Sequence, residues 1–205
     1  MNRVFYRTKK HVEEEKKKYI FLLSIIIIGI ISGCLFILFI TKEDKQLIHN
    51  NLENIIDTIT GKKINYLKTF INSISSNLIS LIGLYILGIS IIGIPIIVFF
   101  LFLKGFTLGF SFISLVSKYR IKGLLGSVSY LFPHEFIKII IFILMGYYTI
   151  NFSIRLFRYL FLKENISLNY YFKNLNKIFI ISLVSLLIAS ILETFLSPIL
   201  IDLWF

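Results

Sequence analysis

Residues 78–117 read LISLIGLYILGISIIGIPIIVFFLFLKGFTLGFSFISLVS, and Lys104 is the one charged residue among them. As a single helix this stretch would be roughly 60 Å long, about twice the hydrocarbon thickness of a bilayer. It must therefore fold back on itself, and GISIIGIPII at 88–97 supplies the turn. Pro95 has no N–H to donate and disfavours helical geometry at the residue before it. We expect two membrane spans here, at 76–92 and 94–116.

The rest of the chain has the same character. Of its 205 residues, 57% are hydrophobic and 16% are charged, whereas soluble domains are about a quarter charged. Further long apolar blocks predict three more spans, at 19–40, 134–156 and 178–200. The sequence therefore predicts an all-α fold: a polytopic membrane helical bundle of about five transmembrane helices, forming a single integral membrane domain over 1–205.

Two segments do not fit a simple span. The polar stretch 41–75 carries apolar residues at helical spacing, which predicts amphipathic external helices. Their apolar face is expected to lie on lipid headgroups or on the bundle itself, with docking of a partner protein as the alternative. The segment GLLGSVSYLF at 123–132 is apolar but too short to cross, which predicts a re-entrant or interfacial segment.

Charge indicates the orientation. The formal net charge is +11, and most basic residues flank apolar spans, which favours topology signals and attraction to anionic lipids over nucleic-acid binding. We expect 1–18 to be a cytoplasmic basic tail before an uncleaved first span, and the C-terminus to be external. In this topology three basic residues face outward: Lys118, Arg120 and Lys122. The alternative is that Lys104 marks a membrane boundary and that 105–132 is a broken hairpin.

The stretch SYLFPHEFIKIII at 129–141 concentrates polar residues in an apolar region. Pro133 and Glu135 suit the first turn of a helix, and Glu135 can pair with Lys138 three residues later. The alternative is a zinc site, since His134 and Glu135 resemble the start of H-E-x-x-H, but Lys138 stands in place of the second histidine. No nucleophile motif or phosphate-binding loop is present, so we expect no enzyme, no metal and no other cofactor.

Lys104 lies near the middle of the predicted span at 94–116, where a charge costs about 2.5–3.5 kcal/mol and should have a partner. The candidate partners are Glu193 and Glu135. Gly105 and Gly109 form a G-x-x-x-G motif that allows close helix packing, and Gly29 and Gly33 repeat the spacing. A packing role is favoured over a water-lined path, and such a face also predicts a homodimer.

The segments KGFTLGF at 104–110 and LFPHEFIKI at 131–139 together resemble the stage II sporulation protein M family, and the resemblance extends over nearly the whole chain. The wider family often has glycine after the histidine and an acidic residue five positions after the proline. Here those positions hold Glu135 and Lys138.

The resemblance implies a function that the residues alone do not. It implies a membrane scaffold of the sporulation engulfment machinery, which holds two peptidoglycan-degrading partners, stage II sporulation proteins D and P, at the septal or mother-cell membrane. A transporter or permease-like subunit that uses Lys104, Glu193 and Glu135 is the alternative.

Overall fold

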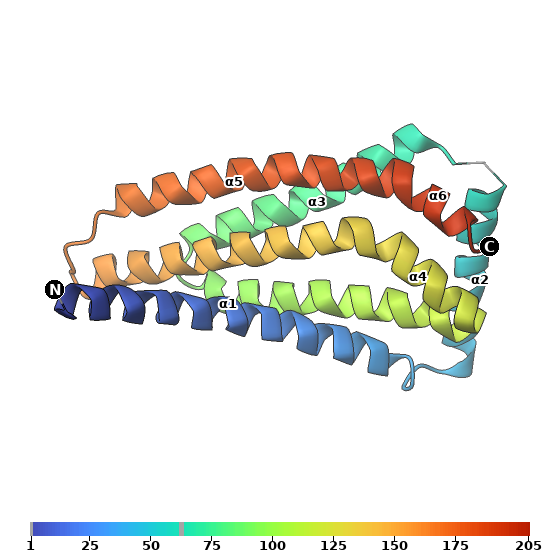
Figure 1. Ribbon diagram of the computed structural model, residues 1–205, viewed down its shortest axis with the longest axis horizontal. Coiled ribbons are helices and arrows are strands. Elements are labelled where there is room, and N and C mark those ends of the chain that lie inside the picture. The colour runs from blue at the N-terminus through green and yellow to red at the C-terminus, as the bar shows by residue number, and fades with distance from the viewer. Residues whose placement is uncertain (1, 62–63) are drawn as a thin grey trace.

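The computed structural model describes residues 2–61 and 64–205, with the side chains of 15–61, 64–131 and 133–205. Its elements run in the order α1 (Asn2–Phe36), α2 (Lys42–Thr60), α3 (Tyr66–Ile89), α4 (Gly93–Phe161), α5 (Leu168–Ile191), a π-helical turn η1 (Leu192–Leu196) and α6 (Ser197–Asp202) (Figure 1). The described chain forms helices and contains no strand.

Five helical segments of the described chain are long and apolar enough to cross a membrane: Glu15–Phe36, Tyr66–Ile89, Gly93–Leu131, Pro133–Phe161 and Leu168–Asp202. They lie lengthwise in one bundle, with the N-terminus at one end and the C-terminus at the other (Figure 1). The predicted all-α membrane bundle with five spans is confirmed. The basic tail is not separate from the first span, because α1 continues from Asn2 to Phe36.

The predicted turn within 88–97 is confirmed, because α3 ends at Ile89 and α4 begins at Gly93. A side chain at Gly93 would overlap the carbonyl oxygen of Leu87, so the tight connection requires glycine here. The hydroxyl of Ser153 donates a hydrogen bond of 2.9 Å to the carbonyl of Ser90 and satisfies a backbone acceptor at the end of α3.

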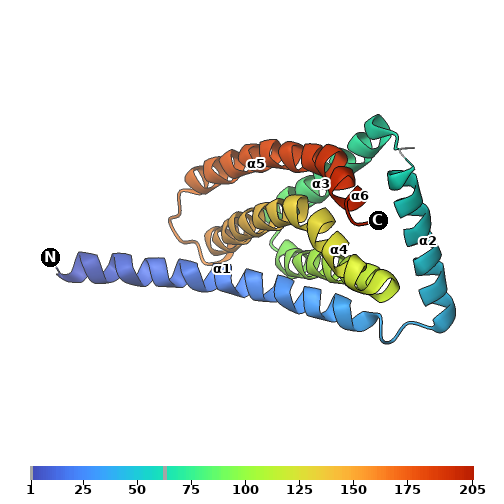
Figure 2. The same cartoon turned by 45° about the vertical axis from the view of Figure 1, so that its right-hand side comes forward.

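α4 is a helical hairpin rather than one rod. Arg120 has φ 52° and ψ −120°, and this non-helical residue reverses the chain at the end of the bundle near α2 (Figure 2). The two arms then pack antiparallel, with the rings of Phe100 and Phe142 5.8 Å apart. The reversal lies within 105–132, where the alternative placed a broken hairpin. The prediction of a re-entrant or interfacial segment at 123–132 is wrong, because 121–131 is the helical start of the returning arm.

The glycine motifs of α1 and α4 face each other within the chain. A side chain at Gly29 or Gly33 would overlap carbonyl oxygens of α4, and one at Gly105 or Gly109 would overlap carbonyl oxygens of α1. Lipid provides no hydrophobic drive for helices to associate, so close backbone packing of this kind holds α1 on the bundle. The packing role of the motif is confirmed, and both motifs are occupied internally, which leaves neither as the predicted dimer face.

α2 lies across the end of the bundle that carries the C-terminus (Figure 2). The Thr41 hydroxyl caps its first turn by accepting a hydrogen bond from the backbone N–H of Asp44. Its apolar face packs on the protein, where Ile56 joins Leu115 and Ile201 in a small core. Within the predicted external loop 41–75, the second amphipathic run leads directly into the next span and forms the first turns of α3.

Candidate functional site

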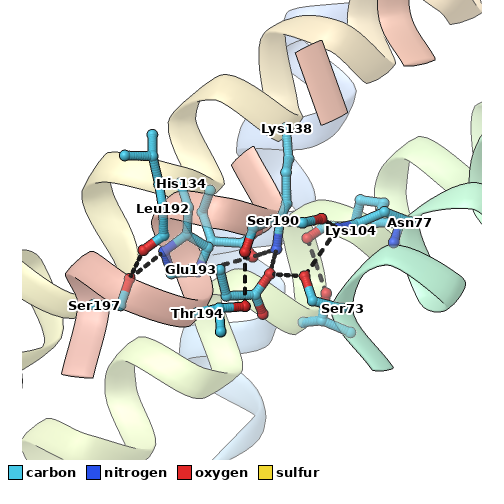
Figure 3. A network of polar contacts seen from close by, with 12 residues as sticks. Ser73, Asn77, Lys104, His134, Lys138, Ser190, Leu192, Glu193, Thr194 and Ser197 are labelled. Atoms are coloured by element: carbon cyan, nitrogen blue, oxygen red, sulfur yellow. Dashed lines mark hydrogen bonds and ion pairs between the residues drawn. The ribbon is translucent and has the colours of Figure 1, made fainter. Parts of the chain in front are cut away.

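The most polar part of the membrane bundle is an ionic network centred on Lys138 in the returning arm of α4 (Figure 3). Its ammonium lies 2.7 Å from Glu193 Oε2 and 2.8 Å from Glu135 Oε1. The predicted pair of Glu135 with Lys138 is therefore confirmed. The Lys138 side chain is 8% exposed, and the two carboxylates are about one quarter exposed. Two carboxylates thus share one buried cation.

Glu193 owes its position to the π-helical turn η1. Pro198, in the first turn of α6, has no N–H for the carbonyl four residues earlier, and its ring crowds that carbonyl. The helix therefore widens into a π-helical turn just before Pro198, where the N–H of Ser197 donates a hydrogen bond to the carbonyl of Leu192, five residues earlier. Single π-helical turns occur frequently at functional sites. Here the turn brings Glu193 toward α3 and α4.

α3 contributes a polar patch one helical turn long. The hydroxyl of Ser73 donates to Glu193 Oε2, the same oxygen that accepts from Lys138. The amide of Asn77 donates to the hydroxyl of Ser190 over 3.1 Å. These contacts join the polar first half of α3 to the end of α5 and to η1, at buried positions where an unpaired polar group would be costly.

His134 joins the network from its other side and is 2% exposed. Its Nδ1 lies 2.9 Å from the Ser197 hydroxyl, and its Nε2 lies 3.5 Å from Glu135 Oε1. The prediction that a helix begins at Pro133 is wrong, since Pro133 lies inside α4. Among the described residues, no group of three or more histidine, cysteine, aspartate or glutamate side chains could hold a metal ion.

Lys104 is not the partner of these carboxylates. No ion pair within the described chain includes it, and both predicted partners, Glu193 and Glu135, bind Lys138 instead. The Lys104 ammonium lies 4.8 Å from the ring centroid of Phe142 and 5.4 Å from that of Phe100. Two aromatic faces therefore stabilise this charge by cation–π attraction.

Two cavities separate α2 from the network. One, of about 370 Å³, has α2 residues on one wall and His134, Glu135 and Glu193 on the other. The second, of about 530 Å³, lies between α2 and α3 and shares Tyr130 and Glu193 with the first. The network is therefore reached from the end of the bundle that α2 covers.

A polar clamp holds α2 over these cavities. Lys118, next to the hairpin tip, donates to Glu53 over 2.8 Å and to the backbone carbonyl of His49. The hydrogen bond from Lys118 lowers the pKa of Glu53. The pKa of His49 is also lowered, first by burial and then by the charges of Lys118 and Lys45. Both pKa shifts mean that the clamp is more stable at neutral pH than in acid.

The sequence predicted about a third of this site. Of the predicted residues, the structure brings His134, Glu135 and Glu193 together, whereas Lys104, Gly105 and Gly109 lie on the other arm of α4. It missed Lys138 as the central cation and five neutral polar partners: Ser73, Asn77, Ser190, Thr194 and Ser197. Their spacing was a usable signal, because polar residues three and four apart share one face of a helix.

A comparison with models of known protein families identifies the family of this chain. The model described as Stage II sporulation protein M matches residues 20–198, which is most of the chain, so the chain belongs to that family. Neither the curated proteins nor the solved structures give a match.

Proposed function

We propose that this member of the stage II sporulation protein M family is a membrane scaffold of the engulfment machinery and recruits peptidoglycan-degrading partners at the septal membrane. Family membership makes it a sporulation-related, multi-pass membrane protein. The observation that supports the finer proposal is α2, a polar-faced helix held by a clamp outside the five spans. By family likeness, the partners are stage II sporulation proteins D and P.

The proposed orientation places α2 on the cell-wall side. The basic tail lies at the end of the bundle opposite α2, together with the connection between α4 and α5 (Figure 1). Basic residues flank that connection on both sides: Arg155, Arg158, Lys173 and Lys177. Positively charged connections favour the cytoplasm and attract anionic lipid, so this end is assigned to the cytoplasm. The C-terminus and the hairpin tip, with its three basic residues, are then external. In this arrangement the protein positions wall enzymes and catalyses no reaction itself.

Recruitment is tested on the outward face of α2, because deleting the whole loop would also remove the first turns of α3. Glu43, Asn50 and Asp57 are exposed on α2 and contact neither the clamp nor the small core. Changing all three to Lys should lower co-purification of the two partners at least about tenfold from sporulating membranes. A control that changes Glu164 and Asn165 to Lys, at the opposite end, should not.

Unchanged co-purification of the α2 variant, from protein that remains folded, would refute loop-mediated recruitment. The transporter alternative predicts ion- or substrate-dependent flux through the reconstituted chain, and flux that disappears in Glu193→Gln would favour it instead. Each variant is solubilised in detergent and its thermal unfolding is compared with that of wild type, which shows whether the variant keeps its fold.

A further inference from the structure

A third cavity, of about 240 Å³, opens between α1 and the two arms of α4 on the side of the bundle. Its walls are almost wholly aliphatic and aromatic, and Val128 and Phe136 at its edge are 46% and 53% exposed. In a membrane-spanning bundle such a surface faces acyl chains. The cavity therefore has the position and the chemistry to receive a lipid tail.

This cavity meets the ionic network. Leu131 and Glu135 line both this cavity and the one beneath α2, so a molecule with its tail in the first is within reach of the carboxylates. Tyr130, Glu193 and two serines, Ser111 and Ser114, surround the far end of the α2 cavity. One ligand could thus place an apolar tail against α1 and a polar head against the network.

The carboxylates have unused acceptor capacity. Lys138 occupies Oε1 of Glu135 and Oε2 of Glu193, and the Ser73 and His134 contacts fall on those same two oxygens. The other oxygen of each carboxylate accepts no hydrogen bond from the described chain, and neither is sealed from the cavities. A carboxylate has about four acceptor positions, so each can take a further donor.

Charge selects the donor. Within contact distance the triad of Lys138, Glu135 and Glu193 holds two negative charges and one positive charge. The nearby Lys104 ammonium lies against the rings of Phe100 and Phe142 and forms no ion pair with either carboxylate. A cationic head with several N–H donors complements this excess, whereas an anionic head would be repelled. We propose that the joined cavities bind a membrane lipid whose headgroup carries a primary ammonium, with the ammonium on Glu135 and Glu193 and one acyl chain against Leu131 and Phe136.

The test compares lipids that differ only in the headgroup. Purified full-length chain is exchanged into mixed micelles with phosphatidylethanolamine, phosphatidylcholine or phosphatidylglycerol of identical acyl chains, and retained lipid is counted by native mass spectrometry. The primary ammonium of phosphatidylethanolamine donates hydrogen bonds, and the trimethylated one of phosphatidylcholine does not. We expect phosphatidylethanolamine to be retained about tenfold more than either other lipid.

Three variants locate the site. Glu135→Gln should reduce the preference to about twofold or less, and Leu131→Trp, which fills the tail cavity without changing a charge, should lower retention of every lipid. Glu43→Gln, exposed on α2 and outside both the clamp and the three cavities, should behave as wild type. Equal retention of the three lipids, a preference for phosphatidylglycerol, or normal retention in Leu131→Trp would overturn the proposal. Displacement of the lipid by millimolar free ethanolamine would also overturn it, by showing a small-cation site.

Discussion

Replacing Lys138 by methionine tests the central contact of the network. The change keeps the length of the side chain but leaves Glu135 and Glu193 without their shared cation. Breaking a buried ion pair by removing one partner costs about 3–5 kcal/mol. Because the carboxylates are about one quarter exposed to cavities, we expect the lower end, about 3 kcal/mol.

The assay is thermal unfolding of the purified chain in detergent, followed by circular dichroism. For a protein of this size 1 kcal/mol corresponds to about 2–4 °C, so Lys138→Met should lower Tm by about 6–12 °C. Adding Glu193→Gln removes one unpaired charge and should restore about 1–2 kcal/mol. Lys104→Met is the matched control, since its ammonium contacts aromatic rings, and its effect should add to that of Glu193→Gln. If Lys138→Met lowered Tm no more than Lys104→Met, or if its double variant were additive, the assigned pairing would be wrong.

Three further changes probe the rest of the fold. Gly105→Leu should strongly reduce accumulation of folded protein, because its side chain would overlap the α1 backbone; Gly83→Leu, with open space around it, is the control, and equal accumulation of the two would contradict the α1–α4 contact. Arg120→Gly should stabilise the chain by about 1 kcal/mol by relieving its positive φ, whereas Arg120→Ala should not; a Tm that falls in the glycine variant would argue against the hairpin tip. Acid should loosen α2. The folded-state pKa of His49 is below its unfolded value, so the stability that His49 contributes is present above about pH 6.5 and is lost as the pH falls. The pKa of Glu53 is also lowered, so protonation of Glu53 adds a further loss of stability at lower pH. After correction for the intrinsic pH dependence of amide exchange, the protection of α2 amides should fall between pH 7.5 and 5, and unchanged protection would refute the clamp.

The spans were predictable because bilayer thickness sets a length that can be counted along the sequence. The turn at 88–97 was equally predictable, since Pro95 fits the first turn of a helix but not its interior, and therefore marks a helix start. The hairpin tip lies in the basic segment directly after the predicted span 94–116, but its exact residue was not predictable, because Arg120 has no intrinsic preference for positive φ. Tertiary packing of the two arms, and not local sequence, fixes that reversal.

The partner of Glu193 was predicted incorrectly for a related reason. Lys104 and Lys138 are both single cations in apolar helices, and hydropathy does not distinguish them. Which one faces α5 depends on the rotation of each α4 arm, and the π-helical turn shifts the phase of α5 just before Glu193. A small rotation of a helix about its axis decides which side chains meet, and the periodicity of a single sequence does not fix that rotation.

The network also accounts for the two positions at which this chain departs from its family resemblance. The resemblance implies an acidic residue at the position of Lys138 and glycine at that of Glu135. Three carboxylates within contact of one another could not all stay ionised at low dielectric. In this chain the acidic group stands at Glu135, one turn earlier on the same face, and Lys138 bridges it to Glu193. Lys138→Asp alone would bring three carboxylates together and should therefore lower Tm far more than Lys138→Asp combined with Glu135→Gly.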